Sequence, residues 1–300
     1  MNKKVILTGA GGFLGTELLA QLKDYKNIEI YVLTSKYNLL LKKYITQNNV
    51  HIYKNDVSVL SCLNLTSTDI LINCAFPRNE HNNFAEGLAY IKELLVASVS
   101  NGIGSVINIS SQSVYSEKRL FPVTEDEPLQ LQSIYAVGKY TTELLTESIC
   151  KNIFFTNIRL SSLIGKNFEQ RITNKLVKQV AEGENITISG INQKFSFLDV
   201  RDAAAALISM LNLSPAKWKK RYNLGSNKSY TLLELTQKIL LIGSEKFNLN
   251  VKLNIIENDL WKNSEMDCSC FYKDFNWIPH YTIYDTIIDL YKEQLSRPRA

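Results

Sequence analysis

The sequence has few of the residues from which metal sites and disulfide frameworks are built. Its 300 residues include three histidines and five cysteines. No two histidines have the HxxxH spacing, and the one close cysteine pair, Cys268 and Cys270, lacks the second pair that a zinc site needs. We therefore predict no metal site and interpret the cysteines as reduced, mostly buried thiols.

Long apolar runs and a strong charge of one sign are also absent. No apolar run approaches the ~20 residues that cross a bilayer, and the run Val5-Ile6-Leu7 is too short for the core of a signal peptide. The 34 Lys+Arg and 29 Asp+Glu give a net charge of only +5, with basic and acidic residues intermixed. We expect a cytoplasmic protein that binds neither nucleic acid nor a membrane.

The pattern of apolar residues predicts alternating strands and helices over the first 160 residues. The expected strands cover residues 5–8, 28–33, 50–53, 70–73, 106–109 and 154–158, and the clearest helices cover 84–100 and 134–150. This alternation predicts an α/β fold, a doubly wound parallel sheet with helices on both faces. The near-continuous apolar strands agree, because a parallel strand is buried on both sides.

After Gly165 the pattern changes and predicts shorter, mixed elements. These are a helix over 171–182, a strand-like run over 186–188, an extended segment over 195–200 and an alanine-rich helix from Asp202. Roughly the last 80 residues are Asn-rich and show no clear period.

A glycine-rich loop, Thr8-Gly9-Ala10-Gly11-Gly12-Phe13-Leu14-Gly15, joins the first expected strand to a helix over 16–23. The glycines allow a tight turn and a close approach of the backbone to a pyrophosphate, while the helix N-terminus offers free N–H groups to the anion. A loop without a ligand is the alternative, but the order of strand, loop and helix favours a dinucleotide. The cofactor residues predicted here are Gly9, Gly12, Phe13, Leu14 and Gly15.

The end of the second expected strand bears on the choice between NAD and NADP. A carboxylate there would bind the ribose 2′-hydroxyl of NAD, but this chain has Thr34-Ser35-Lys36. Two hydroxyls and a cation suit a 2′-phosphate better, so we predict NADP, with NAD as the alternative. After the third strand, Asp56-Val57 could contact the adenine, although an aspartate in a loop is more often a turn residue.

Tyr135 and Lys139 begin a predicted helix with a spacing that places both side chains on one face. A neighbouring ammonium favours the phenolate and lowers a tyrosine pKa from its reference of about 10, which makes Tyr135 a candidate general acid and base. Lys139 could also reach the nicotinamide ribose. Ser111 follows a strand at its carboxyl end, where ligands bind in open α/β sheets, and could donate a hydrogen bond to the reacting oxygen.

In these motifs the chain resembles the extended short-chain dehydrogenases/reductases, in the group of nucleotide-sugar epimerases, dehydratases and reductases. The resemblance spans roughly 220 residues in family order. The matching pieces are Thr8-Gly9-x-x-Gly12-x-x-Gly15, Asp56-Val57, Asn73-Cys74-Ala75, Ser110-Ser111-x-x-Val114-Tyr115, Tyr135-x-x-x-Lys139, Arg159 to Gly165, Phe197 to Asp202 and Tyr222-Asn223-Leu224-Gly225-Ser226.

The resemblance implies a Rossmann-type domain, residues 1–160 plus about 195–215, and a smaller C-terminal α/β substrate domain, 161–194 plus 216–300. It implies that Ser111, Tyr135 and Lys139 are the catalytic set. It also places Cys74, Ala75 and Phe76 along the cofactor, and implies a homodimer built on the helices 84–100 and 134–150.

The sequence departs from the family pattern on the substrate side. Ser162 stands where sugar epimerases commonly have a substrate-binding Asn, and Phe195, beside Lys194, replaces an arginine that contacts the substrate pyrophosphate. We predict Ser111, Ser162 and Lys194 as substrate-binding residues, with Lys262 as the candidate for a second phosphate contact. A lysine can hold a phosphate only as a point charge.

Three functions follow as hypotheses, and the two enzymatic ones belong to polysaccharide biosynthesis. The first is NADPH-linked reduction of the 4-keto group of a nucleotide-activated sugar, with Tyr135 as proton donor. The alternative is a nucleotide-sugar 4-epimerase with tightly bound NAD. The remote alternative is a non-catalytic dinucleotide sensor. Dehydration is disfavoured, because the family's dehydratases usually carry an acidic pair where this chain has Gln112 and Ser113.

Overall fold

The computed structural model describes residues 2–76 and 84–297. Its largest element is a seven-stranded sheet of order β10-β6-β5-β4-β1-β2-β3, in which every pair is parallel. The strands are β1 (Lys3–Thr8), β2 (Ile28–Thr34), β3 (Val50–Lys54), β4 (Ile70–Asn73), β5 (Ser105–Ser111), β6 (Phe154–Leu160) and β10 (Arg221–Leu224). The doubly wound α/β fold predicted from the sequence is therefore confirmed.

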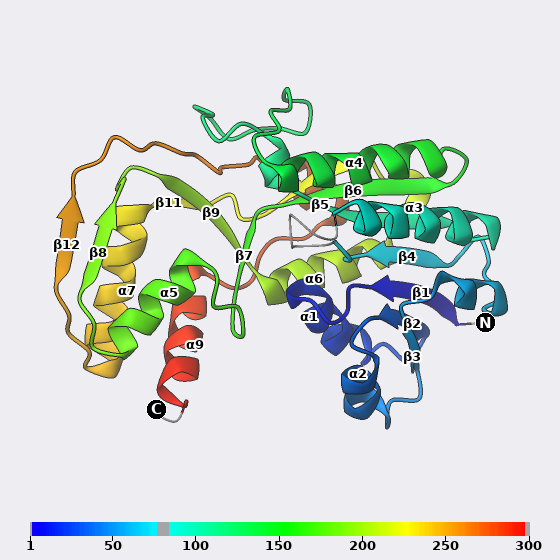
Figure 1. Ribbon diagram of the computed structural model, residues 1–300, viewed down its shortest axis with the longest axis horizontal. Helices are drawn as coiled ribbons and strands as arrows, with labels where there is room; N and C mark the ends of the chain where they lie inside the picture. The colour runs from blue at the N-terminus through cyan, green and yellow to red at the C-terminus, as the bar shows by residue number, and fades with distance from the viewer. Residues whose placement is uncertain (1, 77–83, 298–300) are drawn as a thin grey trace.

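Helices cover both faces of this sheet (Figure 1). One face carries α1 (Phe13–Leu22), α2 (Tyr37–Tyr44) and α6 (Val200–Ser209), and the other carries α3 (Phe84–Ser100) and α4 (Ile134–Ile149). In β1, Val5 and Leu7 belong to the core under α1, α2 and α6, whereas Ile6 belongs to the core under α3 and α4. All three side chains are fully buried. This two-sided burial explains why the strand is apolar at every central position.

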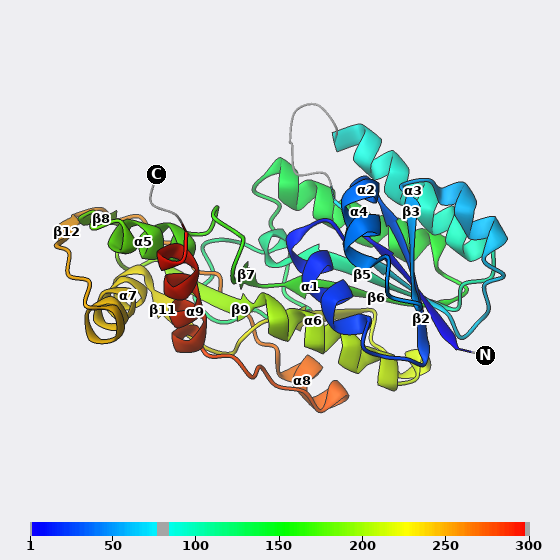
Figure 2. The ribbon, with the colours of Figure 1, turned by 90° about the horizontal axis from the view of Figure 1, so that it is seen from below.

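A smaller part lies beside the sheet and contains the last helix (Figures 1 and 2). Its strands form a three-stranded sheet, β11-β9-β7, and a pair, β12-β8. The strands are β7 (Ser162–Ile164), β8 (Ile186–Ser189), β9 (Lys194–Asp199), β11 (Ser229–Thr231) and β12 (Leu253–Ile256). The helices α5 (Ile172–Ala181), α7 (Leu232–Phe247) and α9 (Ile283–Leu295) enclose its core.

The strand pairing assigns two segments differently from the predicted domain division, which otherwise stays a prediction. β10, predicted in the substrate domain, extends the large sheet by pairing with β6. β9, predicted in the Rossmann domain, pairs with β7 and β11. The helix α8 (Ser269–Phe275) returns to the large sheet, where Phe271 packs against Tyr222 of β10.

Four short 3-10 turns complete the described elements: η1 (Val57–Cys62), η2 (Gln112–Val114), η3 (Met210–Asn212) and η4 (Pro215–Lys217). Within residues 2–76 and 84–297, no helix has the length and apolar character needed to cross a bilayer. The same residues contain no cluster of three or more His, Cys, Asp or Glu side chains arranged to hold a metal ion.

Candidate active site

The glycine loop joins β1 to α1 in a conformation that excludes larger residues. Gly9 has a φ of +70°, and a Cβ there would lie 2.5 Å from the carbonyl carbon of Cys74. A Cβ on Gly15 would lie 2.2 Å from the carbonyl oxygen of Gly9. Gly12 precedes α1 without a side-chain cap, which leaves the first N–H groups of the helix available to an anion.

A cleft of about 1160 Å³ opens at the carboxyl ends of the strands, above this loop. This volume exceeds the roughly 300–1,000 Å³ of most small-molecule sites, so the cleft can take a dinucleotide together with part of a second ligand. The cradle and the cleft thus fit the predicted cofactor. The predicted site residues that line the cleft are Gly9, Gly12, Phe13, Leu14, Gly15, Thr34, Ser35, Lys36, Cys74, Ala75, Phe76, Ser111, Tyr135 and Lys139.

At the end of β2, Lys36 lies across the glycine loop. Its Nζ donates to the carbonyl oxygen of Gly11 at 2.8 Å, and its backbone N–H donates to the hydroxyl of Thr34. After β3, Asn55 lines the cleft. Asp56 instead caps the turn η1 by accepting from the N–H of Ser58, and neither Asp56 nor Val57 is part of the described cleft wall.

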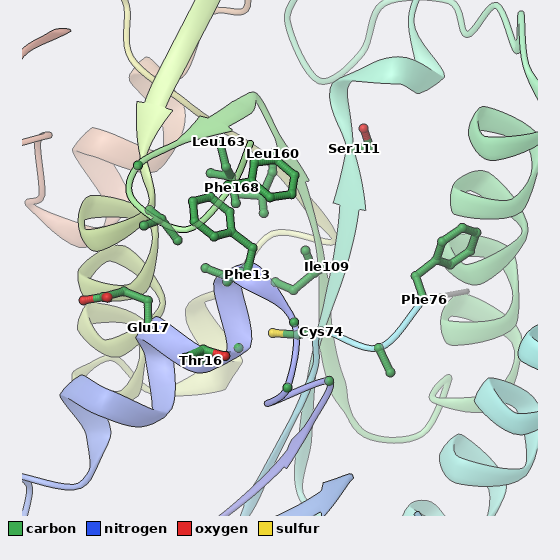
Figure 3. A pocket seen from close by; sticks show the side chains of 18 of the residues that line it. Phe13, Thr16, Glu17, Cys74, Phe76, Ile109, Ser111, Leu160, Leu163 and Phe168 are labelled. Atoms are coloured by element: carbon green, nitrogen blue, oxygen red, sulfur yellow. The ribbon is translucent and has the colours of Figure 1, made fainter. Parts of the chain in front are cut away.

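The three predicted catalytic residues come from β5 and α4, and all three line the cleft. Ser111 lies at the end of β5 (Figure 3). Its hydroxyl accepts hydrogen bonds from the N–H and the hydroxyl of Ser113. Lys139 is 5% exposed, and its Nζ donates to the carbonyl oxygen of Ile109 at 2.8 Å. The same ammonium lies 4.4 Å from the ring centre of Phe76, whose ring meets Tyr135 edge to face at 5.4 Å.

Gly138 makes this packing possible, a role that the sequence motif alone does not show. A Cβ at Gly138 would lie 2.6 Å from Phe76 and 2.4 Å from Phe84. Glycine costs a helix interior about 1 kcal/mol relative to alanine. Here it lets α4 approach Phe76 closely enough for the ring to touch both Tyr135 and Lys139.

A row of buried polar side chains crosses four strands beneath the cleft and was not predicted. The hydroxyl of Thr8 donates to Asn73, Asn73 donates to Asn108, and Asn108 donates to Asn157, at 2.7 to 3.1 Å. The Asn73 side-chain oxygen also accepts from the N–H of Ala75, which fixes the backbone of the cleft wall. Asparagines in strands otherwise apolar on both sides are the sequence signal for such a row, because buried polar groups need partners.

A second buried network supports the end of β5. Arg159 and Glu143 form an ion pair at 2.8 Å with both side chains 1% exposed, and Ser110 donates to the same carboxylate. Burial opposes the charge on Arg159, but the hydrogen bonds and the charge of Glu143 outweigh it and hold its pKa above the ordinary value. Arg159 also donates to the hydroxyl of Tyr115, and burial raises the pKa of Tyr115 to about 12.

The predicted substrate-binding residues outside the catalytic set lie away from the described cleft wall. Ser162 begins β7, while its neighbours Ser161 and Leu163 line the cleft. Lys194 lies 3.6 Å from Glu265. Lys262 is likewise paired, at 2.6 Å from Glu117. Cations that do line the cleft and were not predicted are Lys166, Arg171 and Arg201.

The residue after Ser111 has its own buried partner. Arg119 is 6% exposed and donates through Nη2 to the side-chain oxygen of Gln112. A guanidinium has no acceptor, so this bond fixes the amide oxygen of Gln112 toward Arg119. Burial lowers the pKa of Arg119 to about 10. The residue next to Ser111 is therefore an amide held in one orientation, not a carboxylic acid.

A dinucleotide cradle, a Ser-Tyr-Lys set and a parallel sheet define an enzyme of the extended short-chain dehydrogenase/reductase type. Comparison with known proteins agrees, since residues 5–225 match the model of the NAD dependent epimerase/dehydratase family. The chain belongs to this family.

Individual relatives are distant but cover most of the chain. UDP-glucose 4-epimerase of Drosophila melanogaster is 22% identical over 294 residues, 81% of this chain and 83% of the relative. Spore coat polysaccharide biosynthesis protein SpsK of Bacillus subtilis is 28% identical over 225 residues, 71% of each chain. Among solved structures, UDP-N-acetylglucosamine 4-epimerase from Bacillus cereus has a TM-score of 0.81 and 20% identity, covering 100% of this chain and 99% of its own. The last similarity establishes the fold.

Proposed function

We propose that the chain is a nucleotide-sugar 4-epimerase that keeps NAD bound through the reaction. The epimerase family and the relatives described as 4-epimerases support this alternative better than the NADPH-linked reduction that the sequence analysis places first. A solved UDP-glucuronic acid 4-epimerase of Bacillus cereus, with a TM-score of 0.79 and 19% identity over 97% of this chain and 98% of its own, is in complex with UDP-glucuronic acid and NAD. We infer that the substrate is a UDP-sugar whose product enters polysaccharide synthesis in the cytoplasm.

The observation that carries the proposal is the convergence of four separate segments on one cleft. The glycine loop, the end of β5 with Ser111, the first two turns of α4 with Tyr135 and Lys139, and the segment at Phe76 all line it. Chance similarity in any one motif does not produce this arrangement, because the segments that line the cleft lie up to about 130 positions apart in the sequence, from Gly9 to Lys139.

The chain's own residues have separate roles in this chemistry. The glycine loop and the N-terminus of α1 would hold the pyrophosphate of NAD, whose nicotinamide would supply reversible hydride transfer with either face of the sugar carbon. Tyr135 accepts the proton of the sugar hydroxyl while that carbon is oxidised, and gives it back when the carbonyl is reduced. Ser111 hydrogen-bonds the same oxygen, and the charge of Lys139 favours the phenolate of Tyr135.

The experiment that tests the proposal identifies the cofactor and the product together. Freshly purified protein is denatured, its dinucleotide is identified by mass spectrometry, and UDP-sugars are incubated with the protein and analysed by NMR for inversion at C4. We expect stoichiometric NAD and C4 epimers without added cofactor. Protein that arrives empty, binds NADPH in preference to NADH and consumes it with a 4-keto sugar would overturn the proposal.

NADPH-linked reduction is the second candidate, and a specific observation favours it. Lys36 lines the cleft at the end of β2, and residues 34–36 include no carboxylate for a ribose diol. The variant Lys36→Ala separates the two functions. A reductase would lose NADPH affinity while keeping NADH affinity, whereas an NAD-holding epimerase would show no such difference.

We further propose a homodimer through α3 and α4, both of which expose apolar side chains. Val96 of α3 and Ile134, Val137 and Leu144 of α4 are 42% to 47% exposed. The α4 positions recur at helical spacing and form one stripe, which a second copy of the chain can cover by two-fold symmetry.

The variant Val137→Asp tests this interface. We expect the dimer dissociation constant to rise roughly tenfold or more, because association would bury an unpaired carboxylate. Light scattering across a dilution series measures it. Leu241→Asp is the matched control, since Leu241 is 56% exposed on α7, away from this stripe. A dimer unaffected by Val137→Asp, or weakened equally by both variants, would refute the α3–α4 interface.

A further inference from the structure

A short segment, residues 165–171, joins β7 to α5 within the smaller part and passes next to Phe13 at the end of the glycine loop. It leaves β7 at Gly165, whose φ is +148° and where a Cβ would lie 2.9 Å from Val200 and 3.3 Å from Phe13. It then turns at Asn167, which has a left-handed φ of +62°. The segment ends at Arg171, where α5 begins. We call this segment the strap.

The strap places an aromatic ring on the residue that starts α1. Phe168 stacks on Phe13 with ring centres 4.4 Å apart and planes 11° from parallel. Figure 3 shows both rings on the same side of the cleft, across from Ser111. Phe13 belongs to the turn whose N–H groups are available to an anion, so the stacked pair stands at the edge of the pyrophosphate position. The guanidinium of Arg171 lies 5.4 Å from the Phe168 ring centre.

Polar contacts hold the outer side of the strap to the C-terminal helix α9. The N–H of Asn167 donates to Glu293 at 3.0 Å, and Lys166 lies 3.7 Å from Asp289. Arg297, just after α9, pairs with both Glu169 of the strap and Glu293. These ion pairs are partly or largely exposed, and such pairs contribute little each, so their hold on the outer side of the strap is weak. Weak contacts of this kind with solvent-exposed groups are among the first to break in local opening.

We propose that the strap closes over the pyrophosphate end of the cleft and retains the dinucleotide, and that the Phe13–Phe168 stack stabilises the closed position. The proposal rests on the proposed function, because an epimerase must keep the hydride in the site between the two halves of its reaction. A ring pair of this kind contributes a modest stabilisation, and it is lost when the strap opens. The strap should therefore govern how fast the cofactor leaves more than how fast it enters.

The test measures cofactor release without reference to turnover. Protein loaded with NADH is mixed with excess NAD in a stopped-flow instrument, and the fall of bound NADH fluorescence gives the release rate. We expect Phe168→Ala to release NADH roughly threefold to tenfold faster than the unchanged protein, with a similar association rate. Phe168→Tyr, which keeps the stack, should release it at the original rate. Phe121→Ala is the matched control, because Phe121 is 76% exposed and does not line the cleft.

A variant outside the cleft keeps the proposal falsifiable if Phe168→Ala disturbs the fold. Arg297→Ala removes the ion pairs to Glu169 and Glu293 and leaves the cleft wall intact. It should also speed release, by a smaller factor. If the NADH release rate were unchanged in both Phe168→Ala and Arg297→Ala, the proposed role of the strap would be wrong even if the protein epimerises sugars. Faster release from both, in a protein with no epimerase activity, would support the strap and overturn the proposed function alone.

Discussion

Replacing Tyr135 with phenylalanine is expected to slow turnover by roughly 10² to 10⁴-fold, the usual contribution of a general acid or base. The variant removes one oxygen and leaves the ring that packs against Phe76 at 5.4 Å. The cleft therefore keeps its shape, and we expect dinucleotide affinity within about threefold of the original, a free-energy change under 1 kcal/mol. Loss of rate without loss of binding identifies an interaction made in the transition state.

Steady-state kinetics on the best UDP-sugar, together with NADH titration, measure both quantities for this variant. Tyr140→Phe is the matched control: Tyr140 lies on the same helix but packs against the cluster around Val114 and Tyr115 rather than lining the cleft. It should retain nearly full activity. If Tyr135→Phe also kept most of its activity, Tyr135 would not be the acid and base, and the cleft would need another proton carrier.

The parts of the fold that the sequence predicts are those controlled by local pattern. Val5, Ile6 and Leu7 form a strand buried on both sides, so their apolar run is visible without any partner. The helix predicted over 84–100 is α3 at the same bounds, because its apolar period continues over its full length. The glycine loop is equally local, since its spacing alone requires the turn between β1 and α1.

What the sequence did not predict depends on partners distant along the chain. Arg221–Leu224 joins the large sheet only because β6 leaves an edge for it, and its short run shows no sign of that pairing. Phe168 meets Phe13 from about 155 positions away, and neither residue's own neighbourhood indicates the stack. The position of Lys194 in the sequence predicts a contact with the substrate phosphate, but in the fold Lys194 pairs with Glu265. Only tertiary packing determines this pairing.

The ion pair between Arg159 and Glu143 gives the largest expected effect on stability. It joins β6 to α4 beneath the catalytic end of β5, with both side chains 1% exposed. Arg159→Met would leave the Glu143 carboxylate buried without its cation, and we expect the free energy of unfolding to fall by about 3–5 kcal/mol. Arg221 of the neighbouring β10 pairs with Glu147, one turn further along α4, but these side chains are 36% and 30% exposed. Arg221→Met should therefore cost only about 0–1 kcal/mol.

Urea denaturation followed by circular dichroism measures both losses as shifts in midpoint at constant slope. The double variant Arg159→Met with Glu143→Leu adds a sharper test, because replacing both charges by apolar groups removes the unpaired carboxylate. We expect it to recover most of the stability that Arg159→Met loses. Tyr115 keeps a partner in that variant, since its hydroxyl also donates to Asn223 at 2.8 Å. Equal losses of unfolding free energy for Arg159→Met and Arg221→Met would show that burial does not determine how much stability is lost when an ion pair is broken. A double variant no more stable than the single one would show that Arg159 acts through its shape and its other hydrogen bonds, not through the charge of Glu143.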